Sequence, residues 1–145
     1  MFQPHTYGRY LLLDRVSVGG MAEIFKAVSL DGRPDHAPLV LKRVLPHLSV
    51  EPSFIKMFSN EAAFCIQLDH PNIIRTYDFG HAEGNHYLTM EFVPGQDLLS
   101  INQYARRSGE RLPTELAAYV LQKVAEGLHH AHELSGSDGT LLGLV

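Results

Sequence analysis

Residues 39–44 read Leu-Val-Leu-Lys-Arg-Val, an apolar segment in which Lys42 follows three aliphatic residues. Short segments of this kind predict a β-strand. A lysine that ends a buried strand needs a partner or a ligand, because an unpaired charge is costly away from water. The alternative interpretation is an edge-strand lysine whose amine reaches water along its own carbon chain.

The segment that follows contains a matching acidic residue. Pro52 suits the first turn of a helix, and apolar residues then recur at three- and four-residue steps. Glu61 falls on the same helical face as Phe58 and Cys65, where an unpaired carboxylate would be costly. We therefore expect Glu61 to pair with Lys42. Cys65 is interpreted as a small core residue and not as a nucleophile.

The predicted elements on either side of this pair define the fold class. Strands are predicted at 10–14, 24–29, 39–44, 73–79 and 86–93, and helices after Pro52, at 97–107 and at 114–134. A mostly antiparallel sheet of five strands with one helix against it, followed by further helices, is an α+β fold.

Composition excludes several classes of protein. With 145 residues, 45% hydrophobic and 19% charged, the chain fits one globular domain. A net charge of -4 without a Lys/Arg-rich run does not favour nucleic-acid or membrane-surface binding. No apolar run is long enough to span a bilayer, and the N-terminus does not resemble a signal peptide. The single cysteine predicts a reducing, cytoplasmic setting.

Two adjacent glycines, Gly19 and Gly20, lie between the first two predicted strands, within Ser17–Ile24. Glycines allow the backbone to approach a ligand and point N–H groups at it, which suits phosphates. The simpler interpretation of this pair is an ordinary hairpin turn.

In this order, the features resemble the N-terminal part of a protein kinase domain, of the eukaryotic-like serine/threonine type found in bacteria. Besides the glycine-rich loop, Lys42 and Glu61, the resemblance is carried by His70–Ile74 (His-Pro-Asn-Ile-Ile) and by Tyr87–Gly95. It implies an N-terminal extension over residues 1–9 and a partial kinase domain over 10–145. Within that domain, 10–93 would form the N-lobe and the start of the hinge, and 94–145 the end of the hinge and the first C-lobe helices.

The resemblance also implies a site for ATP. Lys42 would hold the α- and β-phosphates and be steadied by Glu61. Met90 would guard the back of the pocket, and Asp97 would reach the ribose. The remaining residues expected to contact the nucleotide are Ser17, Gly19, Gly20, Ile24 and Val40 from the loop and strands, and Glu91 and Val93 through their backbone groups.

Three local features depart from the kinase pattern. The loop keeps only the middle glycine of the family motif, and Val40 stands where the family has alanine. Asp78-Phe79-Gly80 spells the magnesium-binding triplet, but it precedes the hinge segment, whereas the family triplet follows the catalytic loop. We interpret Asp78 as a strand-end residue and Gly80 as part of a turn.

The sequence contains no His-Arg-Asp catalytic loop, and it ends at Leu141–Val145, where the family would continue with that motif. The Mg²⁺ ligands of the complete domain are therefore not in this chain, and we expect it to be inactive alone towards a protein substrate. The alternatives are a non-catalytic nucleotide-binding regulatory module and the remnant of a truncated gene.

The last predicted helix carries two further signals. His129 and His132 share a face, but histidines near a helix C-terminus also complement the macrodipole, so no metal site is predicted there. The apolar positions Ala117 to Ala131 form a continuous stripe, which predicts a surface for self-association if nothing else covers it.

Overall fold

The computed structural model describes residues 2–31 and 37–134 of the chain. The terminal segment 141–145 lies outside the described residues. The chain forms two compact units, Met1–Asp69 with Ile74–Phe92, and His70–Ile73 with Val93–Val145. Each unit is described on its own.

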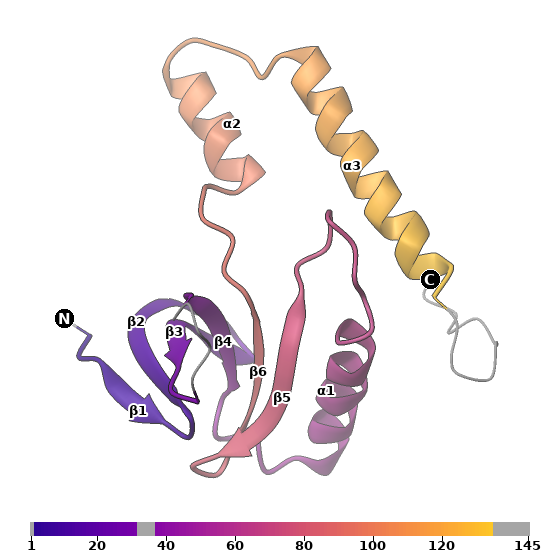
Figure 1. The fold of residues 1–145 in the computed structure, drawn as a ribbon. Helices are drawn as coiled ribbons and strands as arrows, with labels where there is room; N and C mark the ends of the chain where they lie inside the picture. Colours follow the sequence, from indigo (N-terminus) through magenta and orange to yellow (C-terminus); the bar gives the residue numbers. More distant parts are fainter. Residues whose placement is uncertain (1, 32–36, 135–145) are drawn as a thin grey trace. The chain divides into compact units, whose positions relative to one another are not determined.

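The first unit is built on a six-stranded antiparallel sheet in the order β1-β2-β3-β4-β6-β5 (Figure 1). Its strands are β1 (His5–Tyr7), β2 (Tyr10–Val18), β3 (Ala22–Ser29), β4 (Leu39–Val44), β5 (Thr76–Ala82) and β6 (Asn85–Glu91). Helix α1 (Pro52–Cys65) runs beside β5. The predicted α+β class is confirmed, and β2 extends further than expected because two register shifts let it follow β3.

The two faces of the sheet bury separate cores, because successive strand residues point to opposite faces. Tyr87 of β6 belongs to a cluster with Tyr7, Phe25 and Leu41. Its neighbour Leu88 belongs to the cluster on the α1 side, with Val44, Phe58 and Ala62. The predicted apolar face of α1 is therefore the face that covers the sheet.

The sheet has one strand more than the five expected from the sequence. β1 comes from the residues interpreted as an N-terminal extension, and it pairs with β2. Tyr7 is fully buried, and its hydroxyl lies 2.8 Å from the carbonyl oxygen of Ala82 and 3.2 Å from that of Asn85. A strand of three residues is too short to show an alternating pattern, so sequence reasoning missed it.

The second unit contains α2 (Leu98–Arg107) and α3 (Thr114–His132), together with the loop His70–Ile73. The loop packs on α3: Asn72 Nδ2 donates to Glu126 Oε2 at 3.1 Å, and the rings of His70 and His130 stack at 5.1 Å. Gly127 permits this approach, because a Cβ there would lie 3.3 Å from Ile73. The residues after the first helix thus pair with a later helix and do not start β5, which begins at Thr76.

Among the described residues, the apolar stripe of α3 is largely accessible to solvent. Leu121, Val124 and Leu128 keep 69%, 50% and 53% of their surface accessible. In the part of the chain that the structure describes, no helix of either unit is long and apolar enough to cross a membrane.

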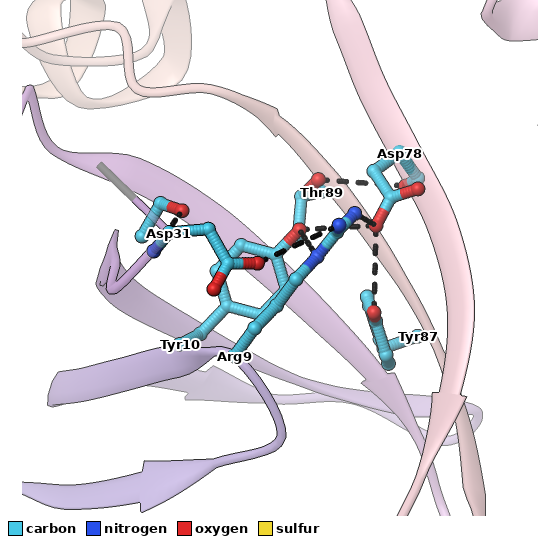
Figure 2. A network of polar contacts seen from close by, with 7 residues as sticks. Arg9, Tyr10, Asp31, Asp78, Tyr87 and Thr89 are labelled. Carbon is cyan, nitrogen blue, oxygen red and sulfur yellow. Dashed lines mark hydrogen bonds and ion pairs between the residues drawn. The ribbon is translucent and has the colours of Figure 1, made fainter. Parts of the chain in front are cut away.

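Asp78 lies within β5 and is the centre of a polar network that joins three strands (Figure 2). Its carboxylate accepts hydrogen bonds from the Arg9 guanidinium, from the Tyr10 hydroxyl at 3.0 Å and from the Tyr87 hydroxyl at 3.4 Å. Burial, with the nearby Tyr10 and Asp78, raises the pKa of Tyr87 to about 12, so the hydroxyl stays a donor. Asp78 therefore has a structural role in this chain.

Gly80 also lies within β5, so the interpretation of this glycine as turn chemistry was wrong. Gly80 faces Tyr87 across the strand pair, and a Cβ at this position would lie 2.4 Å from the Tyr87 hydroxyl oxygen. The glycine makes room for the tyrosine that donates to Asp78. The triplet is thus explained by packing within the sheet.

Replacing Asp78 by alanine should destabilise the chain by about 2 kcal/mol, because it leaves Arg9, Tyr10 and Tyr87 without their acceptor. The matched control is Asp14→Ala, which removes an exposed carboxylate that accepts a hydrogen bond from the neighbouring Arg15 N–H. This control should cost less than about 0.5 kcal/mol. Urea unfolding of the variants measures both values, and equal losses would contradict a structural role for Asp78.

Candidate functional site

The glycine-rich loop connects β2 to β3 through a tight turn. The N–H of Gly19 donates to the carbonyl of Ala22 at 2.9 Å. Neither Gly19 nor Gly20 has a positive φ, and a Cβ on Gly20 would meet nothing within 4 Å. The fold alone therefore does not require glycine at position 20, which leaves an unhindered backbone that a ligand could approach.

An ion-pair network that was not expected from the sequence braces the strands around this loop. Glu23, the second residue of β3, contacts Arg43 of β4 at 2.7 Å and Arg15 of β2 at 3.3 Å. Burial favours the neutral form of Glu23, but the hydrogen bonds and charges of Arg43 and Arg15 outweigh it and lower the pKa. The sequence shows that these residues carry opposite charges. It does not show that they are neighbours, because that depends on how β3 and β4 are paired.

The strand register brings the predicted lysine and its neighbours onto one face of the sheet. Lys42 lies opposite Ile24 of β3 and opposite Leu88 of β6. Val40, two residues earlier, lies opposite Met90. Since Leu88 and Met90 pack on the α1 side, Ile24, Val40 and Lys42 also belong to that side.

Lys42 and Glu61 are brought together by this arrangement. The Lys42 Nζ lies 3.8 Å from Glu61 Oε1 and 5.5 Å from the centre of the Phe58 ring. The Lys42 side chain is 29% exposed and that of Glu61 is 52% exposed, so water screens the pair and its own contribution to stability is small. The Lys42 side chain is therefore partly buried and has a charged partner. Its ammonium group is held in place and remains accessible.

Cys65 lies one turn beyond Glu61 and is half-buried. Burial raises the pKa of its thiol, the Glu61 carboxylate raises it further, and Lys42 partly opposes them. A thiol with a raised pKa is a poor nucleophile, because the thiolate is the reactive form.

At the end of β6, the hinge residues make contacts within the first unit. Met90 packs partly buried against the α1-side core. The N–H of Glu91 donates to the carbonyl of Arg75 at 2.8 Å, so a contact from Glu91 to a base would use its carbonyl group. Lys26 Nζ lies 4.6 Å from the centre of the Phe92 ring, a cation–π contact that the sequence did not indicate.

The last two predicted site residues lie in the second unit. Val93 is exposed, and Asp97 is the N-cap of α2. The Asp97 carboxylate accepts from the Ser100 N–H at 2.7 Å and from the Ser100 hydroxyl at 3.0 Å, and these bonds lower its pKa. Its observed role is to begin the helix.

Carboxylates that could hold Mg²⁺ do not gather anywhere in the described residues, where no group of three or more His, Cys, Asp or Glu side chains could hold a metal ion. The Asp78 carboxylate already accepts hydrogen bonds from Arg9 and two tyrosines. The described residues therefore do not fit a magnesium site.

Comparison with known proteins identifies the family of the chain. The sequence profile of the protein kinase domain matches residues 10–135. The chain belongs to the protein kinase family. The match includes the loop, Lys42, Glu61 and the hinge, and ends at the close of the described part of the chain.

Several bacterial kinases are similar to this partial kinase domain. Tyrosine-protein kinase MasK of Myxococcus xanthus is 39% identical over 145 residues, which are all of this chain and 22% of MasK. Serine/threonine-protein kinase PrkC of Bacillus subtilis is 30% identical over 128 residues, covering 87% of this chain and 18% of PrkC. The chain thus spans about a fifth of the length of these relatives.

A solved kinase domain has the same fold. The crystal structure of the Mycobacterium tuberculosis PknI kinase domain matches with a TM-score of 0.73 at 25% identity. The match covers 89% of this chain and 49% of the PknI kinase domain. The kinase-like α+β fold predicted from the sequence is confirmed, and the chain corresponds to about half of a kinase domain.

Glu23→Gln should lower the free energy of unfolding by about 1–2 kcal/mol near neutral pH, because it removes the charge that pairs with Arg43 and Arg15. The pKa of folded Glu23 is lowered from 4.5, so this stabilisation is present above that pH and is lost as the pH falls through the folded pKa. The difference between variant and wild type should therefore shrink on acidification.

The control is Glu51→Gln, which neutralises an exposed carboxylate that makes no side-chain cap bond to α1. Chemical denaturation at a series of pH values compares the three proteins. A stability difference for Glu23→Gln that stays constant through the acidic range would contradict the ion-pair account.

Proposed function

We propose that this chain is the nucleotide-holding half of a protein kinase domain and that it binds ATP on the α1 side of the sheet, between the loop and the hinge segment. The observation that carries the proposal is the Lys42–Glu61 pair, 3.8 Å apart and still accessible to solvent. A positive charge fixed by a helix carboxylate beside a glycine loop suits the phosphates of a nucleotide.

Each predicted residue has a role that its position supports. The Lys42 ammonium would contact the α- and β-phosphates while Glu61 limits its rotation. Ser17, Gly19 and Gly20 would offer backbone N–H groups or close approach to the same phosphates. Ile24 and Val40 would form an apolar surface for the adenine ring, on the same side of the sheet as Lys42.

The hinge residues would complete the nucleotide site. Met90 would close its inner end, the carbonyl of Glu91 and a backbone group of Val93 would bond to the base, and Asp97 would reach the ribose. The Asp97 carboxylate would then bond to the ribose while it also accepts the hydrogen bonds that cap α2.

Transfer of the phosphoryl group is proposed for the whole protein, in which ATP supplies the γ-phosphoryl group and a protein hydroxyl accepts it. We propose serine and threonine hydroxyls as acceptors, because PrkC and the PknB of Mycobacterium leprae, which is 32% identical over 134 residues, are named as serine/threonine kinases. Tyrosine is the second candidate, favoured by the 39% identity to MasK over the full length of this chain.

Two further proposals concern the setting of the protein. The single cysteine, which cannot form a disulfide within this chain, supports a reducing compartment such as the cytoplasm. The exposed side chains Leu121, Val124 and Leu128 support self-association through α3, with a second copy of the chain covering the apolar stripe.

ATP should raise the midpoint of thermal unfolding of this chain, and Lys42→Met should weaken ATP binding at least about tenfold by removing the charge that faces the phosphates. Lys56→Met is the matched control, because it removes the same charge from an exposed position on the same helix as Glu61. Calorimetric titration with ATP gives the three affinities. Equal ATP affinity of wild type and Lys42→Met would refute the proposed site.

A further inference from the structure

The β5–β6 hairpin holds two histidines opposite one another. Its turn is made by Glu83 and Gly84, with φ values of 49° and 80°. Two consecutive positive φ values are typical of the type I′ turn that closes a tight two-residue hairpin. Ala82 and Asn85 flank the turn, and His81 and His86 form the next cross-strand pair.

This position brings the two imidazoles close together. In a two-residue hairpin, the residues flanking the turn form a hydrogen-bonded pair, so the next pair is the non-hydrogen-bonded kind, with Cα atoms only about 4.5 Å apart. The ring centres of His81 and His86 lie 4.8 Å apart, at 65° to each other. Two imidazoles from separate strands thus share one face of the sheet.

The hairpin that carries the pair is firmly held. The buried Tyr7 hydroxyl contacts the carbonyl groups of Ala82 and Asn85 beside the turn. The His86 ring also stacks on Phe79 at 5.8 Å, and Phe79 contacts Phe58 of α1. The His86 ring is therefore fixed on one side, whereas His81 is exposed and can rotate towards it.

One ring nitrogen of the pair is buried without a partner in the described part of the chain. His86 Nδ1 is buried and has no hydrogen-bond partner among the described residues. Neutral imidazole is the form that coordinates metal ions, through a ring nitrogen that carries no proton.

We propose that His81 and His86 form a two-histidine site for a divalent transition-metal ion of the Zn²⁺, Ni²⁺ or Cu²⁺ class. Imidazole nitrogen suits these ions, whereas Mg²⁺ prefers oxygen ligands. No third His, Cys, Asp or Glu joins the pair in the described part of the chain, so water completes the coordination. The site is open and exchangeable, unlike a closed four-ligand structural site.

The test uses the 145-residue chain and NiCl₂ in calorimetric titration at neutral pH. Wild type should bind one ion per chain, and His81→Gln should weaken binding at least about tenfold, because one imidazole cannot replace a chelating pair. His81 is exposed, so this variant keeps the fold. The control is the double variant His129→Gln/His132→Gln, which removes two exposed histidines from α3 and should bind Ni²⁺ like wild type.

A second readout locates the ion directly. Substoichiometric Cu²⁺ should broaden the ring proton signals of His81 and His86 in NMR spectra before those of the other histidines. The proposal is overturned if wild type binds no Ni²⁺ at millimolar concentration, if His81→Gln binds as wild type does, or if another histidine is broadened first.

Discussion

The ion pair between Lys42 and Glu61 depends on a single constraint, the register of three neighbouring strands. Ile24, Lys42 and Leu88 lie side by side in β3, β4 and β6, and Leu88 packs against the core under α1. A slip of one residue in β4 would move Lys42 to the opposite face, because side chains alternate along a strand. The lysine would then be unable to reach Glu61, and the apolar positions around it would change faces as well.

The opposite face of the sheet helps to keep that register. Asp78 joins Arg9, in the turn before β2, and Tyr10, the first residue of β2, to Tyr87 of β6. Tyr7 of β1 reaches the β5–β6 turn. These bonds connect strands at the two ends of the sheet order, and the core between them is filled by tyrosine, phenylalanine and leucine. The sheet is thus stabilised on one face, while Lys42 lies partly exposed on the other.

Much of this organisation could be predicted from the sequence, and the exceptions have physical reasons. The strand of Lys42 and the helix of Glu61 were predicted because each has a regular apolar pattern. β1 was missed because a strand of three residues shows no periodicity. Gly80 was wrongly assigned to a turn, because the tyrosine that requires a glycine at this position lies on the neighbouring strand. The Glu23 network and the His81–His86 pair were missed because only the register makes those residues neighbours.

We propose that Glu61 acts on the nucleotide through Lys42, and a double-mutant cycle on ATP affinity tests this most directly. Lys42→Met, Glu61→Gln and the double variant are compared with wild type by calorimetric titration. The account predicts that the double variant loses no more affinity than Lys42→Met alone, because Glu61 has nothing left to position once the lysine is gone. Losses that add independently would contradict it.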